Sequence, residues 1–299
     1  MKNELLRLEH ICFQYEDKFP ALKDVSITFQ KGERIVVLGN NGAGKSTFFL
    51  CCNGILRPQS GAIFLHGQKM SGSKEDIRKL RQTVGLVFQE PDTQIIAGTV
   101  GNEVSFGPMN LGLDRKEVEL RISMSLARMN LEGYESRAPH YLSGGEKKRV
   151  SIADILAMEP DMILLDEPTA SLDPENVALL ERTLEELNEA GITLVVSTHD
   201  VDFAYGFARR AVVLSQGEII RDSDIEEVFR DDEVLEKAGL KKPLLCKVAE
   251  VLETHFPEAG DIKRPRRMEA FSDYAKRLLG QDPKQACSPQ EKRTAEEGF

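Results

Sequence analysis

Five short runs of apolar residues between positions 35 and 214 constrain the fold of this 299-residue chain more than any other feature. They comprise residues 35–38, 84–88, 162–165, 194–196 and 211–214. None of them alternates apolar with polar residues, which is the pattern of a strand with one solvated face. A strand that is apolar on both sides must be covered on both faces, as in a parallel sheet packed between helices.

Helical patterns separate these runs, and the clearest one repeats its apolar residues every three or four positions. That stripe consists of Val177, Leu180, Leu184 and Leu187. Asp173 precedes it as a helix N-cap, Pro174 suits the first turn, and Gly191 lies just beyond its end. Strands that alternate with helices predict an α/β fold with a mainly parallel sheet at its core.

The remaining segments differ from this core pattern. Residues 6–13 and 25–29 alternate apolar with polar residues more, and they suit an antiparallel β subdomain near the N-terminus. Residues 99–138 contain no strand-like run and predict an inserted α-helical subdomain. After about residue 239 the pattern breaks into short pieces, and the polar tail from about residue 285 is expected to be disordered.

The composition argues against several classes of protein. A net charge of −10 is unlike a chain that coats nucleic acid, which would usually be basic. The five cysteines form no C-x-x-C pair and fit reduced thiols, with Cys51 and Cys52 as small packing residues. The N-terminus is charged where a secretory signal needs apolar residues, and no apolar run reaches the ~18 residues that would span a bilayer. Any membrane part is therefore expected to come from another chain.

Residues 39–46, GNNGAGKS, match the phosphate-loop pattern G-x-x-x-x-G-K-[ST] at every fixed position, between a predicted strand and an apolar helical segment. Glycines let backbone N–H groups converge on phosphate oxygens, and the helix N-terminus adds favourable partial charge. Lys45 is predicted to neutralise the β- and γ-phosphates of ATP, and Ser46 to ligate Mg²⁺. The alternative is an ordinary glycine-rich turn. The predicted nucleotide contacts are Gly39, Asn40, Asn41, Gly42, Ala43, Gly44, Lys45, Ser46 and Thr47.

Polar residues follow three of the predicted strands, at the edge where a parallel sheet places its ligands. Asp166 is predicted to hold Mg²⁺ through water, and Glu167 to take a proton from the water that attacks the phosphate. His199 is predicted to contact the γ-phosphate or this water, and Gln89 to contact both Mg²⁺ and water. Taken singly, the carboxylates suit an exposed acidic turn and the histidine a structural role. Their convergence on one phosphate loop favours a catalytic site.

Residues 142–146, LSGGE, predict the start of a helix in which Ser143 and Glu146 form a capping box. Together with the other motifs and their order, this segment resembles the signature sequence of ABC-type ATPases. The resemblance covers roughly residues 4–240, although Glu146 replaces the glutamine that is commonest in the family.

The resemblance implies a P-loop ATPase that works as a head-to-tail dimer. Each nucleotide lies between the phosphate loop of one subunit and the signature sequence of the other, so Ser143 and Gly145 would contact the partner's ATP. The family also implies that Tyr15 stacks on adenine and that Asp173 crosses the dimer interface. The alternative for Tyr15 is a tyrosine on a strand face.

Three further segments resemble the ATPases of energy-coupling-factor importers, which include the cobalt- and nickel-transporter ATPases. They are QEPDTQ at 89–94, FGP at 106–108 and GGEKKR at 144–149. In these proteins the segment after the glutamine, here Asp92 to Ile96, helps to couple the ATPase to a membrane subunit, and a C-terminal helical extension supports dimerisation. A solvated loop is the alternative for this segment.

The resemblance therefore predicts the ATP-hydrolysing subunit of an energy-coupling-factor importer, with ATP and Mg²⁺ as its ligands. A nucleotide-binding domain is expected over residues 1–239, with its helical subdomain at about 95–160, and a partly helical extension over 240–299. The expected partners are a second ATPase subunit, identical or paralogous, and transmembrane coupling and substrate-binding subunits. The chain would then lie at the cytoplasmic face of the cell membrane.

The cargo predicted from the family is cobalt or nickel ion, with a vitamin as the alternative. A soluble ABC ATPase that acts on ribosomes or DNA, or an exporter ATPase, would use the same catalytic residues. Ribosomal types usually carry two ATPase domains and DNA-repair types a long coiled coil, and this sequence contains neither. No nucleic-acid partner is expected, because the basic cluster at 263–267 suits a solvated charge run better than a contact with RNA or anionic lipid.

Overall fold

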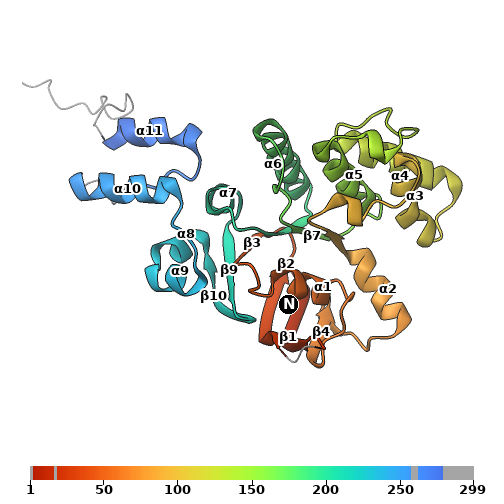
Figure 1. Ribbon diagram of the computed structural model, residues 1–299, viewed down its shortest axis with the longest axis horizontal. Helices are drawn as coiled ribbons and strands as arrows, with labels where there is room; N and C mark the ends of the chain where they lie inside the picture. The colour runs from red at the N-terminus through yellow and green to blue at the C-terminus, as the bar shows by residue number, and fades with distance from the viewer. Residues whose placement is uncertain (1–2, 17–18, 257–261, 279–299) are drawn as a thin grey trace, which may run out of the picture. The chain divides into compact units, whose positions relative to one another are not determined.

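The computed structural model describes residues 3–16, 19–256 and 262–278. The chain divides into two compact units, Met1–Lys241 and a second that begins at Lys242. The first unit contains two sheets and most of the helices, and the second contains two helices (Figure 1). The predicted disordered tail from about residue 285 lies outside the described residues.

A six-stranded sheet forms the core of the first unit, in the order β10-β9-β3-β8-β7-β6. All neighbours pair in parallel except β9 and β10, which pair antiparallel. The strands are β3 (Arg34–Leu38), β6 (Val84–Val87), β7 (Met162–Asp166), β8 (Thr193–Ser197), β9 (Arg210–Ser215) and β10 (Glu218–Asp224). The five apolar runs of the sequence analysis form the five parallel strands of this sheet, except that Phe88 lies just beyond β6, and the predicted α/β fold with a mainly parallel core is confirmed.

The register of the parallel strands aligns their carboxyl ends. Val37 of β3 lies opposite Ser197 of β8, and Ser197 lies opposite Asp166 of β7. All residues of β7 and β8 are buried, because helices cover both faces of the sheet. The residues that follow these strands therefore meet at one edge.

A four-stranded antiparallel sheet packs beside this core, in the order β2-β1-β4-β5. Its strands are β1 (Glu4–Gln14), β2 (Pro20–Gln30), β4 (Ser60–Leu65) and β5 (Gln68–Lys69). Helix α1 (Lys45–Cys52) joins the two sheets, since Phe48 packs on Phe29 of β2 within the same apolar cluster as Val37 and Leu214. Cys51 and Cys52 are fully buried in that cluster, as predicted.

Helices α3, α4 and α5 group together between β6 and β7 in the chain (Figure 1). Their bounds are Val100–Asn110, Arg115–Arg128 and Gly144–Leu156, with short 3₁₀ helices at Pro91–Thr93 (η1) and Pro139–Tyr141 (η2). The remaining helices of this unit are α2 (Lys74–Thr83), α6 (Pro174–Glu189), α7 (Val201–Phe207), α8 (Ile225–Arg230) and α9 (Asp232–Ala238). The inserted helical subdomain of the predicted fold class is thus present.

Helix α6 follows its sequence pattern closely. The Asp173 carboxylate accepts a hydrogen bond from the Asn176 backbone N–H at 2.9 Å, which is the N-cap contact that the sequence predicts. Leu180, Leu184 and Leu187 form its buried face.

The second unit contains α10 (Leu244–His255) and α11 (Met268–Leu278). Cys246 and Ala249 are the buried residues of α10, and Tyr274 is the buried residue of α11. Arg264 of the basic cluster forms a two-point ion pair with Glu253, at 2.7 and 2.6 Å, and its side chain is only 10% exposed. Arg264 is therefore a structural residue of this unit and not part of a solvated charge run.

Candidate active site

The ends of four core strands border one open cleft of about 420 Å³. The phosphate loop follows β3, Gln89 lies just after β6, Asp166 and Glu167 end β7, and His199 follows β8. The cleft is lined by Tyr15, Ala21, Asn40, Asn41, Gly42, Gly44, Lys45, Ser46, Thr47, Gln89, Asp166, Glu167 and His199. The structure thus brings together the residues that the sequence predicted for catalysis and for Mg²⁺.

The phosphate loop needs its glycines for packing as well as for backbone conformation. Gly42 and Gly44 have φ angles of +81° and +107°, which residues with a side chain rarely adopt. A Cβ at Gly39 would lie 2.3 Å from the Leu214 carbonyl oxygen, and one at Gly44 would lie 2.6 Å from that of Ala21. The loop therefore presses against β9 and β2, and its backbone N–H groups at the start of α1 are held toward the cleft.

Lys45 lies at the base of the cleft, where its side chain is 8% exposed. Its ammonium donates a hydrogen bond to the Gly39 carbonyl oxygen at 2.7 Å and lies 3.8 Å from Glu167 Oε1. This position places one positive charge between the phosphate loop and the carboxylate predicted as general base.

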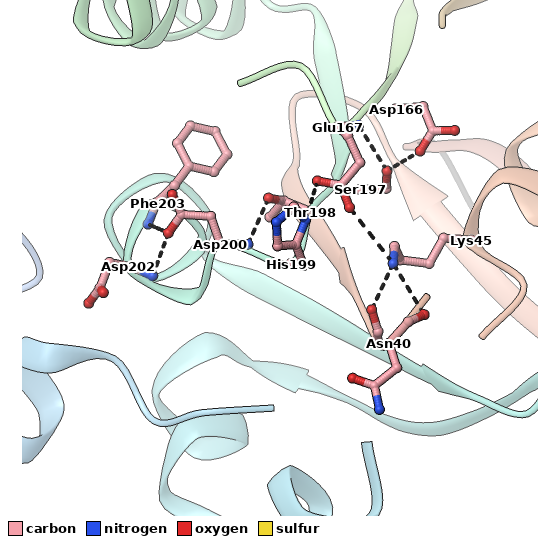
Figure 2. Close-up of polar contacts among 11 residues, drawn as sticks. Asn40, Lys45, Asp166, Glu167, Ser197, Thr198, His199, Asp200, Asp202 and Phe203 are labelled. Carbon is pink, nitrogen blue, oxygen red and sulfur yellow. Dashed lines mark hydrogen bonds and ion pairs between the residues drawn. The ribbon is translucent and has the colours of Figure 1, made fainter. Parts of the chain in front are cut away.

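Glu167 lies between Lys45 and His199 in the cleft. While Oε1 faces Lys45, Oε2 lies 2.9 Å from Nδ1 of His199, as Figure 2 shows. Glu167 is nearly buried and has a φ of +44°, an uncommon backbone conformation for a residue with a side chain. His199 itself is 69% exposed, so its ring is open to a ligand in the cleft while one nitrogen is fixed by Glu167.

Ser197 is a residue of this site that the sequence analysis missed. Its hydroxyl donates a hydrogen bond to Asp166 Oδ1 and accepts one from the Glu167 backbone N–H at 3.1 Å (Figure 2). A serine at the end of an apolar run was the available signal. Its partners became visible only through the parallel pairing of β7 with β8, which sets Ser197 opposite Asp166.

Tyr15 borders the same cleft next to the phosphate loop. Its hydroxyl lies 3.2 Å from Thr47 Oγ1, and its ring stands edge-on to Phe13 with centroids 5.0 Å apart. Tyr15 is 44% exposed, and an exposed aromatic ring at the border of the cleft can stack on a flat ligand. Its contact with adenine stays a prediction.

Ser143 and Gly145 of the signature sequence are not among the residues that line this cleft. Ser143 is the N-cap of α5, and the predicted capping box with Glu146 is present. The Glu146 carboxylate also accepts a hydrogen bond from the Tyr134 hydroxyl at 2.7 Å, a contact in which it serves purely as acceptor. Hydrogen bonds from Tyr134 and Ser143 hold the pKa of the Glu146 carboxyl below its usual range, although burial acts in the opposite direction.

The segment after Gln89 is bound to α5. The Gln94 side chain accepts a hydrogen bond from the Phe88 backbone N–H at 3.2 Å and donates one to the Ser151 carbonyl oxygen at 3.0 Å. The half-buried Gln94 side chain therefore bridges Phe88 and Ser151, and Gln94 is not a solvated loop residue. Asp92 is exposed and forms an ion pair with Lys147 at 2.7 Å.

The donor set of the cleft fits a magnesium ion bound with a nucleotide. Ser46, Gln89 and Asp166 each contribute an oxygen donor, and Mg²⁺ in nucleotide sites is usually held by one or two such groups, phosphates and water. In the described part of the chain no cluster of three His, Cys, Asp or Glu side chains offers a stand-alone metal site. The arrangement suits phosphoryl transfer to water, with phosphate-binding N–H groups, a lysine and a carboxylate base at one edge.

Fold and site together define a nucleotide-binding ATPase, and comparison with known proteins identifies its family. The model of the ABC transporter family matches residues 22–170. The energy-coupling factor transporter ATP-binding protein EcfA of Methanothermobacter thermautotrophicus is 48% identical over 239 residues, which are 80% of this chain and 77% of that protein. EcfA of Methanocaldococcus jannaschii is 45% identical, over 83% of this chain and 89% of that protein.

Solved structures agree with this assignment. CbiO1 from Clostridium perfringens, described as part of the ABC transporter complex cbiONQ, has a TM-score of 0.71 at 38% identity and covers 84% of this chain and 99% of that one. The dimeric ATP-binding cassette MJ0796, bound to ADP and Pi after hydrolysis, has a TM-score of 0.66 at 29% identity over 74% of this chain and 99% of that one. The chain belongs to the ATP-binding proteins of ABC transporters, and it is an ATPase.

Removal of the Ser197 hydroxyl tests its role in orienting Asp166. We expect Ser197→Ala to lower the ATPase kcat by about 10- to 100-fold, because the loss of one hydrogen bond to a charged group is of the order of 1.5–3 kcal/mol. ATP affinity in the absence of Mg²⁺ should stay unchanged. Steady-state ATPase assays and nucleotide titrations of both proteins measure these effects. Ser125→Ala, which removes a buried hydroxyl bonded only within α4 among the contacts described, is the control. Equal loss of activity in both variants would contradict the prediction.

Asp154 of α5 makes stability depend on pH. Burial and the nearby Glu103 carboxylate raise the pKa of its carboxyl from 3.8 to about 7. A hydrogen bond from Gln94 acts in the opposite direction but has the smaller effect. Because the folded state binds the proton more tightly, its stabilisation is complete below about pH 4 and is lost as the pH rises through 7. We expect Asp154→Asn to raise the free energy of unfolding at pH 8 relative to the native chain, by about 2–4 kcal/mol. The two proteins should differ little at pH 4, as urea unfolding at both pH values will measure. The prediction would be contradicted if the free energies of unfolding of the two proteins differed by the same amount at pH 4 and at pH 8.

Proposed function

We propose that this chain is the ATP-hydrolysing subunit of an energy-coupling-factor-type importer. The observation that carries the proposal is the single cleft that the phosphate loop, Gln89, Asp166, Glu167 and His199 line, in a chain 48% identical to an energy-coupling factor transporter ATP-binding protein. None of the helices in the described residues is long and apolar enough to cross a membrane. The transport pathway is therefore assigned to partner subunits, a transmembrane coupling subunit and a substrate-binding subunit, with this chain at the cytoplasmic face.

The proposed chemistry uses the residues of the cleft. ATP lies on the phosphate loop with adenine against Tyr15, and a bound Mg²⁺, held by Ser46 and Gln89 and through water by Asp166, would offset the phosphate charge. The water oxygen attacks the γ-phosphorus, the bond to the ADP oxygen breaks, and Glu167 takes the water proton. His199, fixed by its 2.9 Å contact with Glu167, orients the water or the γ-phosphate.

A second ATPase subunit completes the proposed site. Ser143 and Gly145 do not line the chain's own cleft, yet they lie at the N-terminus of α5, where backbone N–H groups favour an anion. We assign them to the ATP of the partner subunit, which is an identical chain or a paralogue, and we assign Asp173 to the interface. The nucleotide-binding domain is taken as residues 1–239, and the helical extension from 240 onward is proposed to support dimerisation.

The cargo proposed is cobalt or nickel ion, with a vitamin as the alternative. This preference rests on the resemblance to metal-transporter ATPases, because cargo selectivity in such importers belongs to the membrane subunits.

Purification of the tagged full chain from native membranes tests the assignment. We expect a polytopic membrane protein to co-purify in a fixed ratio, together with ATPase activity, since the chain's own described helices do not span a bilayer. Mass spectrometry identifies the partners, and metal analysis of the complex tests for cobalt or nickel. Co-purification of ribosomes or DNA in place of a membrane subunit would overturn the proposal.

Substitution of Glu167 tests the assigned base. We expect Glu167→Gln to reduce turnover by at least about 100-fold, which is the lower range for loss of a general base. Because ATP binding is retained, the variant should accumulate as an ATP-bound dimer in size-exclusion chromatography with ATP and Mg²⁺. Glu189→Gln, an exposed position at the end of α6, is the matched control and should behave as the native chain. Full hydrolysis by Glu167→Gln would remove Glu167 from this role.

A further inference from the structure

A lysine of α5 lies buried beneath the end of strand β6. The Lys148 side chain is 2% exposed, and its ammonium donates hydrogen bonds to two successive carbonyl oxygens, that of Gln89 at 2.5 Å and that of Phe88 at 3.1 Å. These carbonyls lie where the β6 strand has ended, so the sheet no longer supplies them with donors. The ammonium supplies hydrogen-bond donors in place of a neighbouring strand, at the point where the chain turns toward the cleft.

Burial of the Lys148 ammonium costs free energy of desolvation, which its hydrogen bonds to the backbone offset. Desolvation lowers the pKa of its ammonium from 10.5 to about 8, although the carboxylates of Glu90 and Asp166 favour the charged form. An apolar residue of similar length would avoid this cost. The ammonium, in contrast, binds the carbonyl groups of the two peptide bonds that flank Gln89.

Other contacts tie the same segment to the same helix without reaching Gln89. Gln94 donates to the Ser151 carbonyl oxygen, and Asp92 pairs with Lys147 at the surface. Of these contacts, that of Lys148 holds the residue whose side chain lines the nucleotide cleft. The Lys148 ammonium thus joins the backbone of Gln89 directly to α5.

We propose that Lys148 is a positioning residue for ATP hydrolysis, which acts by holding Gln89 in place relative to α5. The proposal rests on the proposed function, in which Gln89 contacts Mg²⁺ and the attacking water. Helix α5 also begins with Ser143 and Gly145, which we assign to the ATP of the partner subunit. A shift of this helix when the partner's nucleotide binds would then move Gln89 in the chain's own cleft, through the Lys148 ammonium.

A double-mutant cycle separates this role from a merely structural one. The variants are Lys148→Met, which keeps the length of the side chain but removes its charge and donors, Gln89→Ala, and the two combined. We expect Lys148→Met to lower kcat about 10-fold and to raise the Mg²⁺ concentration for half-maximal activity several-fold. The tenfold loss in kcat corresponds to about 1.4 kcal/mol, which is near the low end for a hydrogen bond that involves a charged group. ATP affinity without Mg²⁺ should stay within twofold, because the phosphate loop is untouched.

The combined variant gives the decisive comparison. If Lys148 acts through Gln89, the double variant should be no slower than Gln89→Ala alone, since the group that Lys148 positions is already gone. Losses that multiply, with an unchanged Mg²⁺ requirement, would overturn the proposal and leave Lys148 as a structural residue. Native-like turnover of Gln89→Ala beside a slow Lys148→Met would overturn it as well, while the ATPase assignment would stand. A native chain without Mg²⁺-dependent ATPase activity would instead overturn the proposed function.

Two further variants guard against trivial outcomes. Lys147→Met removes the neighbouring lysine of the same helix, whose surface ion pair with Asp92 does not reach the cleft, and we expect it to retain native turnover and Mg²⁺ requirement. Thermal unfolding checks that each variant is folded. If Lys148→Met does not fold, Lys148→Gln, which keeps one hydrogen-bond donor without the charge, replaces it in the same cycle with the same expected non-additivity.

Discussion

The parallel pairing of β8 with β3 and β7 is the interaction on which the rest of this structure depends. It sets Val37, Ser197 and Asp166 side by side at the carboxyl ends of three strands. Each strand end then delivers a different group to one edge: the phosphate loop, a pair of carboxylates and a histidine. The apolar strands behind this edge are fully buried, so the polar residues are held on a rigid support.

Helix α5 is a second support of the site, because it binds the segment after β6 through a side chain and a backbone carbonyl on successive turns. Lys148 holds the Gln89 carbonyl, and the Ser151 carbonyl receives the Gln94 side chain. The first turn of the same helix carries Ser143 and Gly145 of the signature sequence. One helix therefore connects a residue of the chain's own cleft to the surface proposed for a partner's nucleotide.

Much of the fold and of the candidate site was predictable, for physical reasons that differ from element to element. Two-sided apolar runs predict buried parallel strands, and the phosphate loop is contiguous, so its chemistry is encoded within eight residues. The sequence predicted no contacts for Ser197 or Lys148, and for Gln94 it left a solvated loop as the alternative, which the structure does not bear out. No local pattern indicates the contacts of Lys148 and Gln94, because each has a partner more than fifty residues away in the chain.

By itself, the sequence determined the α/β core, the phosphate loop and the strand ends that carry Gln89, Asp166, Glu167 and His199. These features depend on local patterns, in which hydrophobic periodicity and glycine placement act over a few residues. Only the tertiary structure decided that Ser197 holds Asp166, that Glu167 lies between Lys45 and His199, and that Lys148 holds Gln89. These contacts depend on strand register and helix packing, which bring distant segments within hydrogen-bonding distance and which no local pattern records.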